Sequence, residues 1–263
     1  MSVFASTAEF YGAYRSDVPP IVAQRLSDAA PPAGPDGVRR LLDVGTGTGF
    51  VITALDAYFD DVIGVDPDPD LLAVASRSLS AQIEQRRVTL VPGTAEDFTV
   101  PPGWQAQLVT VCRAFHWFDR ARFLARAGDV LAPGGVLAVF GDRSVWAANA
   151  PWKTATLDVL REFLGEERRA GAGTYRAPTH DYADDLVEAG YRGVERESVP
   201  VRRIRTVESV IGYLHSTSFA SLTVLGNRAS AFDDQIAERL EPFVDADGLL
   251  VDENEFDILT ARR

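Results

Sequence analysis

The chain contains a single cysteine, Cys112, and a single lysine, Lys153, among its 263 residues. One cysteine cannot form an internal disulfide, which agrees with a reducing compartment, so we expect a cytoplasmic protein. No apolar run approaches the ~18–20 residues that a membrane-spanning helix needs. Residues 1–5 also lack the basic and then apolar succession of a signal peptide. We therefore expect no membrane partner.

Positive charge is scarce as well. Acidic side chains outnumber basic ones by 38 to 26, so the formal net charge at pH 7 is −12. A nucleic-acid partner requires a basic face that neutralises phosphates, and this balance argues against one. A negative field weakly favours neutral or cationic small ligands. With 46% apolar residues, the chain can form one sizeable core and a small additional lobe.

The most informative stretch is Leu-Leu-Asp-Val-Gly-Thr-Gly-Thr-Gly-Phe at positions 41–50. Residues 40–44 predict a strand, and apolar residues at helical spacing over 51–59 predict a helix. Gly45, Gly47 and Gly49 stand between them. Glycine tolerates positive φ and lets a ligand approach the backbone closely. This succession predicts a nucleotide-like ligand at the start of the helix.

The surrounding residues discriminate between ligands. A dinucleotide fingerprint is Gly-x-Gly-x-x-Gly, but Phe50 stands where its third glycine would be. No Gly-Lys-Ser/Thr ending of a phosphate loop follows either. Asp43 would repel a pyrophosphate and attract an ammonium group. A second predicted strand, residues 62–65, ends in Asp66, whose carboxylate can accept hydrogen bonds from two ribose hydroxyls. A ligand with an α-amino group and a ribose fits best.

Asp43, the three glycines and Asp66 together resemble the first motifs of the class I S-adenosylmethionine (SAM) dependent methyltransferases. The resemblance covers Tyr11 to about Gly141. It implies an α/β fold with a Rossmann-like seven-stranded sheet, the last strand antiparallel, and SAM as the cofactor. The residues that it places at the cofactor are Tyr14, Arg15, Asp43, Gly45, Thr46, Gly47, Gly49, Asp66, Pro67, Leu71, Thr94, Ala95, Glu96, Arg113, Ala114 and His116.

Residues 93–98 follow a third predicted strand, residues 88–91. The family uses this turn to hold adenine, through a backbone N–H and a side chain that accepts from the exocyclic amine. Many members have Asp where this chain has Thr94, so Thr94, Glu96 and Asp97 all stay candidates, and we favour the Ala95 backbone with Glu96.

The next helix begins near Pro69. Asp68 predicts its N-cap, with Pro69 in the first helical position, and the helix extends to about residue 85. Leu71 would lie where adenine passes over the helix start, although ordinary core packing explains it equally well.

Residues 113–119, Arg-Ala-Phe-His-Trp-Phe-Asp, follow a fourth predicted strand over 108–112. The stretch closely resembles Ala-x-His-Trp-Phe-Asp in the trans-aconitate-like branch of the type 11 methyltransferases. Phe115, Trp117 and Phe118 surround His116 and could line a dry slot for the substrate. Alternatively, Trp117 and Phe118 begin the next helix and pack inward. His116 is the first candidate for a base, with Tyr14 and His215 behind it, although the acceptor need not require one.

The segment before the first predicted strand is aromatic and carries one arginine, and a helix is predicted over residues 20–29. This aromatic arm either packs on the flank of the domain or forms a flap over the ligand. The resemblance favours the flap, with Tyr11, Tyr14 or Arg15 at the ligand, because the same branch has a similar Tyr-x-x-Tyr-Arg stretch near its cofactor.

After a helix over 121–131 and a strand over 136–140, the alternation of strands and helices breaks near residue 150. Helices are predicted near 151–164, 181–189, 206–219 and 230–240, and strands over 195–204 and 253–261. The extra helices would form a lid over the substrate. The further substrate-binding candidates are Arg143, Trp146, Tyr213 and His215. No histidine has metal-ligand spacing, so we expect no metal.

We predict a domain order of N-terminal arm (1–37), SAM-binding core (38–145), and lid helices with the last strands (146–263). The predicted function is transfer of a methyl group from SAM to a small-molecule acceptor, by N- or O-methylation, for example in natural-product tailoring. Two alternatives stay open. One is a carboxyl O-methyltransferase of the trans-aconitate type, with Arg15, Arg113 and Arg143 available as a cationic clamp, and the other is a non-catalytic SAM-binding regulator. A homo-oligomer is also left open.

Overall fold

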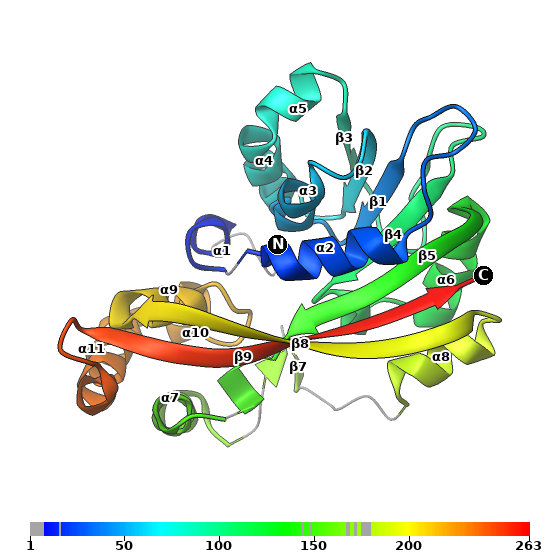
Figure 1. Ribbon diagram of the computed structural model, residues 1–263. Helices are drawn as coiled ribbons and strands as arrows, with labels where there is room; N and C mark the ends of the chain where they lie inside the picture. Colours follow the sequence, from blue (N-terminus) through cyan, green and yellow to red (C-terminus); the bar gives the residue numbers. More distant parts are fainter. Residues whose placement is uncertain are drawn as a thin grey trace. The chain divides into compact units, whose positions relative to one another are not determined.

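Seven strands form one mixed sheet in the spatial order β3-β2-β1-β4-β5-β9-β8 (Figure 1). The computed structural model describes residues 8–15, 17–143, 145–147, 149–166, 169–170, 173–174 and 180–263. The strands of the large sheet are β1 (Arg40–Val44), β2 (Asp61–Asp66), β3 (Val88–Pro92), β4 (Ala106–Cys112), β5 (Leu131–Asp142), β8 (Arg192–Thr206) and β9 (Leu249–Arg262). A separate two-stranded sheet pairs β6 (Arg169–Ala170) with β7 (Gly173–Thr174).

The first five strands of this sheet are parallel to their neighbours, and β9 pairs antiparallel to β5. Parallel strands are covered on both faces and therefore consist of apolar runs, as in β4, which is buried from Ala106 to Val111. The chain leaves β1 toward β2 on one side and returns to β4 on the other. This reversal places a ligand site beyond the carboxyl ends of β1 and β4. The predicted fold class is confirmed.

The helices flank and follow these strands. The α-helices are α1 (Ala8–Tyr14), α2 (Pro20–Ala29), α3 (Phe50–Leu55), α4 (Pro69–Ser78), α5 (Ser80–Glu84), α6 (Arg120–Val130), α7 (Pro151–Leu164), α8 (Tyr182–Glu188), α9 (Val207–His215), α10 (Leu222–Leu225) and α11 (Ala229–Leu240). Short 3-10 helices are η1 (Phe115–Trp117), η2 (Val145–Ala147), η3 (Gly226–Arg228) and η4 (Glu241–Phe243). Within the described part of the chain, no helix combines the length and apolar character needed to cross a membrane.

Two predicted helices differ in extent from those in the structure. The helix after the glycine turn ends at Leu55, where the chain turns, and not at residue 59. The prediction extended it because Phe59, which is also buried, continues the apolar pattern. The helix capped by Asp68 is interrupted at Leu79, whose dihedrals (φ −105°, ψ 18°) depart from helical values. Asp68 itself caps as predicted, since its carboxylate accepts from the N–H groups of Asp70 and Leu71.

The described contacts divide the chain into two compact units. The sheet unit comprises Asp17–Asp142, Pro178–Val199 and Phe256–Arg263, and the helical unit comprises Met1–Ser16, Arg143–Ala177 and Pro200–Glu255. Helix α2 lies in the sheet unit and α1 in the helical unit.

Each unit has its own hydrophobic core. In the sheet unit, Val109 and Val111 of β4 pack in one cluster with Phe123 and Ala127 of α6, which recur at helical spacing. In the helical unit, α11 buries residues at every fourth position, Phe232, Ile236 and Leu240, in a cluster shared with α7 and α9. Each of the buried Val, Leu, Ile and Phe side chains contributes about 1.5–3 kcal/mol on burial.

Candidate functional site

The turn between β1 and α3 requires its glycines. Gly45, Gly47 and Gly49 have φ values of 74°, 55° and 86°, a region that side chains with a Cβ rarely adopt. Gly49 is the N-cap residue of α3. A Cβ on Gly45 would lie only 2.6 Å from the Cβ of Ala114. The turn therefore keeps a bare backbone at the carboxyl end of β1, as predicted from its sequence.

Hydrogen bonds fix this turn to the end of β2. The N–H groups of Gly45 and Thr46 donate to the carbonyl of Val65 at 2.8 and 2.9 Å. The N–H of Gly47 donates to Asp66 Oδ2 at 2.8 Å, and Asp66 Oδ1 accepts from the N–H of Asp68 at 2.9 Å. Burial raises the pKa of Asp66. Each carboxylate oxygen carries two lone pairs, so Asp66 can accept further hydrogen bonds from hydroxyl groups.

Asp43 is fully buried at the carboxyl end of β1. It lies opposite Thr110 of β4 in the sheet register, and the Thr110 hydroxyl donates to Asp43 Oδ1 at 2.7 Å. Asp43 Oδ2 has no hydrogen-bond partner of normal geometry among the described residues. Burial raises the pKa of Asp43 to about 6, and the hydroxyls of Thr46 and Thr110 oppose this shift. A buried carboxylate oxygen without a partner favours a cationic donor from a ligand.

Two threonine hydroxyls in the same turn resemble Asp43 Oδ2 in being buried without a partner of normal geometry among the described residues. They are Thr46 Oγ1 and Thr48 Oγ1. Thr46 is a predicted cofactor residue, but Thr48 and Thr110 were missed by the sequence interpretation. The available signal was the alternation of threonine with glycine in the turn, and the polar Thr110 inside the apolar run 108–111.

The predicted adenine side is formed by the turns after β2 and β3. Leu71 is buried in the first turn of α4, and Pro67 is exposed. In the turn after β3, Ala95 is buried and Thr94 is exposed. Glu96 Oε1 already accepts from the N–H of Asp119 at 2.8 Å.

The chain leaves β4 through a residue with unusual backbone dihedrals. Arg113 has a φ of 57°, and its Nε donates to Asp142 Oδ1 at 2.5 Å. Ala114 follows and lies against Gly45. The structure thus brings Ala114 to the glycine turn and gives the Arg113 side chain an ionic partner on β5.

The aromatic residues after Ala114 differ in their burial. The Phe115 ring is in the core, with edge-to-face contacts to Phe118, Phe123 and Tyr182. Its surroundings are those of a packing residue, the role that the sequence suggested as the alternative for Trp117 and Phe118. His116 and Trp117 are exposed, with ring centroids 5.0 Å apart.

Tyr14 and Arg15 interact within the helical unit. The Tyr14 hydroxyl donates to Glu208 Oε1 at 3.2 Å, and this hydrogen bond is the main cause that raises the pKa of Tyr14. The Tyr14 ring lies against Gly212, where a Cβ would approach it to 2.4 Å. Arg15 Nε donates to Ser216 Oγ at 3.0 Å. Both residues therefore pack on α9 and the residue that follows it.

The other candidates of the helical unit are also engaged. Arg15 and Arg205 place their guanidinium groups 5.2 and 5.4 Å from the ring centroid of Tyr213. His215 is buried, with Nδ1 3.0 Å from the Ala220 carbonyl and Nε2 2.8 Å from Asp233 Oδ1. Both ring nitrogens of His215 have partners inside this unit, which is the environment of a structural histidine.

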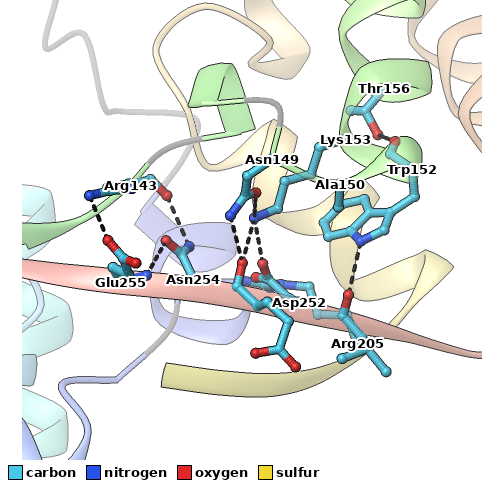
Figure 2. Close-up of polar contacts among 12 residues, drawn as sticks. Arg143, Asn149, Ala150, Trp152, Lys153, Thr156, Arg205, Asp252, Asn254 and Glu255 are labelled. Atoms are coloured by element: carbon cyan, nitrogen blue, oxygen red, sulfur yellow. Dashed lines mark hydrogen bonds and ion pairs between the residues drawn. The ribbon is translucent and has the colours of Figure 1, made fainter. Parts of the chain in front are cut away.

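Arg143 is held by the facing strand β9. Its side chain forms an ion pair with Glu255, its N–H donates to the Glu255 carbonyl, and its own carbonyl accepts from Asn254 (Figure 2). The side chains of the two remaining substrate candidates, Tyr11 and Trp146, lie outside the described residues. No group of three or more metal-ligating side chains is found among the described residues.

Comparisons with known proteins agree with this geometry. Residues 42–139 match the family model described as "Methyltransferase domain". An uncharacterized methyltransferase of Mycobacterium tuberculosis is 37% identical over 134 residues, which are 51% of this chain and 49% of that protein. The erythromycin 3''-O-methyltransferase of Saccharopolyspora erythraea is 29% identical over 184 residues, 68% of this chain and 58% of that protein.

The fold is shared with solved structures. A protein of Anaeromyxobacter dehalogenans that is thought to be a type II methyltransferase superposes with a TM-score of 0.65 at 22% identity, covering 95% of this chain and 98% of that one. The chain spans about half the length of the first curated relatives that it matches. The predicted resemblance to type 11 methyltransferases is confirmed, while the trans-aconitate branch stays a prediction. Residues 42–139 of this chain therefore match the type 11 methyltransferase domain, and the chain shares the fold of this solved structure.

Proposed function

We propose that this protein is a SAM-dependent methyltransferase acting on a small-molecule acceptor. The observation that carries the proposal is the carboxylate of Asp43, buried beside the glycine turn with one oxygen lacking a partner of normal geometry among the described residues. An α-ammonium group satisfies such an oxygen, whereas a phosphate is repelled by it.

The residues around the turn fit the remaining parts of SAM. Asp66, at the tip of the neighbouring strand, has lone pairs for two ribose hydroxyls. The bare backbone of Gly45 and Gly47 allows a close approach. Ala95 and Glu96 are the candidates for adenine, and Leu71 lies in the first turn of α4. This set of groups supports SAM over a dinucleotide.

When bound, SAM supplies an electrophilic methyl group on a sulfonium, and its transfer is an in-line displacement. The contribution that we assign to this chain is orientation of the reactants and exclusion of water, which can supply on the order of 7–11 kcal/mol. Exposed His116 and Trp117 at the end of β4 are the candidates to face the acceptor. A hydroxyl acceptor would need a base. His116 is our choice, because the raised pKa of Tyr14 makes its phenolate scarcer.

We further propose a neutral or amine-bearing acceptor, of the kind met in natural-product tailoring. Two of the three arginines available to clamp a carboxylate already form ion pairs, Arg113 with Asp142 and Arg143 with Glu255. Such pairing reduces the positive charge that they offer to a substrate. The similarity to an erythromycin O-methyltransferase supports a natural product as acceptor, and the choice between nitrogen and oxygen stays open.

The cofactor part is tested by isothermal titration calorimetry with SAM and with its demethylated product, S-adenosylhomocysteine (SAH). We expect both to bind wild-type protein and neither to bind Asp43→Asn with measurable heat. Asp60→Asn is the matched control on the surface of the same unit. Failure of the wild type to bind either compound would refute the proposal.

Catalysis is tested separately by a methyl-transfer screen with isotopically labelled SAM and a metabolite library. Binding of SAM without transfer to any acceptor would favour a regulatory SAM-binding protein. Once an acceptor is found, His116→Ala decides the role of the base. Unchanged turnover across pH would show that His116 does not take the proton.

A further inference from the structure

Arg113 adopts a backbone conformation that is unfavourable for its residue type. Among the described residues, only Arg86 and Arg113 have positive φ without being glycine, and Arg113 has a φ of 57°. Residues with a Cβ hold such dihedrals when their surroundings impose them, and they are frequent at functional sites. Arg113 is the residue at which the chain leaves β4 toward the glycine turn.

Three contacts within the sheet unit hold Arg113 in place. Its N–H donates to the carbonyl of Phe140 at 3.0 Å, which extends the pairing of β4 with β5. Its Nε contacts Asp142 Oδ1 at 2.5 Å, and the two side chains are only 13% and 12% exposed. Its guanidinium lies 5.5 Å from the ring centroid of Phe256. Gly141 makes room for this arrangement, because a Cβ there would come within 3.1 Å of Arg113 Cγ.

The position of Arg113 determines where the next residue lies. The methyl group of Ala114 occupies the space beside Gly45, 2.6 Å from where a Cβ of that glycine would be. The ring of Phe118 comes within 3.5 Å of the same point. A displacement of the segment after β4 would therefore move atoms that lie directly against the glycine turn.

We infer that Arg113 and Asp142 are positioning residues, which set the glycine turn in its ligand-binding shape by fixing the segment from Ala114 to Phe118 against it. The inference rests on the proposed function, because it concerns the affinity of that same site for SAM and SAH. In this arrangement Arg113 acts through Ala114 and touches no part of the ligand.

The test compares the SAH dissociation constants of Arg113→Gln and Asp142→Asn with that of wild type, at a temperature well below every unfolding midpoint. Each variant is expected to bind SAH about tenfold more weakly, and the double variant no more weakly than either single one. Arg113→Lys keeps the charge and is expected to restore most of the affinity. Arg113→Gly accepts the positive φ without strain but lacks the ion pair, and is expected to lose affinity like Arg113→Gln.

The matched control is Arg40→Gln. Arg40 also forms ion pairs, with Asp36 at 2.6 Å and Asp61 at 3.2 Å, but at the opposite, amino-terminal edge of the sheet. This variant is expected to lower the unfolding midpoint and to leave SAH affinity unchanged.

Three results with these variants would overturn the inference. Wild-type affinity in both Arg113→Gln and Asp142→Asn would show that the pair does not position the turn. A loss in Arg113→Gln alone would assign Arg113 a direct contact with the ligand. Wild-type affinity in Arg113→Gly would show that the ion pair is not required, and that any loss of affinity in Arg113→Gln comes from backbone strain at this position. If wild-type protein binds no SAH at all, the proposed function fails, and the inference fails with it.

Discussion

At the scale of single residues, Asp43 shows how folding and binding oppose each other. Burial raises its pKa to about 6 from an ordinary value of 3.8. The pKa of Asp43 is therefore higher in the folded protein than in the unfolded chain. Protonated Asp43 favours the folded state at low pH, and this stabilisation is lost as the pH rises through about 6. The ionised side chain therefore costs the ligand-free protein up to about 3 kcal/mol at neutral pH. The same ionised form is the one that an ammonium group requires.

The first prediction follows from this pKa. Affinity for SAM is expected to fall about tenfold between pH 7.5 and pH 5, because about nine-tenths of Asp43 is protonated at the lower pH. Calorimetric titrations across this range measure the change. Asp43→Asn should remove both the binding and its pH dependence, while raising the free energy of unfolding of the ligand-free protein at pH 7.5. A less stable Asp43→Asn protein would contradict the argument.

The second prediction concerns Gly45, for which the chain offers a matched control in Gly37. Their φ values are 74° and 76°, but a Cβ on Gly45 would meet Ala114, and one on Gly37 would meet nothing within 4 Å. Both alanine variants are expected to lose about 1–2 kcal/mol of stability through backbone strain. Only Gly45→Ala should also weaken SAH binding. Equal SAH affinity in the two variants would mean that Ala114 does not constrain the turn.

At the scale of elements, α9 begins with a capping box. The Thr206 hydroxyl accepts from the N–H of Ser209 at 3.1 Å, and Ser209 Oγ accepts from the N–H of Thr206 at 3.1 Å. Thr206→Ala is expected to lower the free energy of unfolding by about 1 kcal/mol, because the N–H of Ser209 loses its acceptor. Urea denaturation measures this loss. Thr99→Ala, at an exposed loop position, is the control that should change nothing.

Helix α7 is joined to β9 by a buried ionic cluster (Figure 2). Lys153 Nζ lies 2.7 Å from Asp252 Oδ1, and Arg205 Nε lies 2.8 Å from Asp252 Oδ2. The Lys153 and Asp252 side chains are each 3% exposed.

Lys153→Met is expected to cost about 3 kcal/mol, because a buried carboxylate loses one of its cations. Thermal and urea unfolding check this value. The exposed pair of Arg161 with Asp158 supplies the control, and Arg161→Met should cost less than about 0.5 kcal/mol. Similar losses in the two variants would show that burial does not strengthen the Lys153 pair.

At the scale of the whole molecule, a ligand that binds only the folded state stabilises it. At an SAH concentration of 100 times its dissociation constant, the free energy of unfolding is expected to rise by about 2.7 kcal/mol. Hydrogen exchange should slow at amides of residues 43–50 and 64–68, the segments that carry Asp43, the glycine turn and Asp66. Protection confined to α7 and α11 would place the ligand elsewhere.

The sequence was sufficient where the signal is local. Apolar runs predicted the parallel strands, and Asp43 and Asp66 were identified because each stands at a fixed distance from the glycine turn. Partners distant in sequence left no such signal. Tyr14 packs against Gly212 and Arg15 bonds to Ser216, about 200 positions later, and nothing local indicates these contacts. Phe115 and Trp117 look equivalent in sequence, yet contacts with Tyr182 bury only the first.

The burial of Lys153 has a practical consequence, since this residue carries the sole ε-amino group of the chain. Succinimidyl esters, glutaraldehyde and the enzymes that attach acetyl groups or ubiquitin to lysine would all meet a folded surface without an accessible lysine amine. The group becomes available when the core around Asp252 opens. An amine-reactive dye should thus label Lys153 only through opening of this core, and at the opening rate when the dye reacts faster than the core closes. This one side chain is therefore an intrinsic reporter of conformational opening.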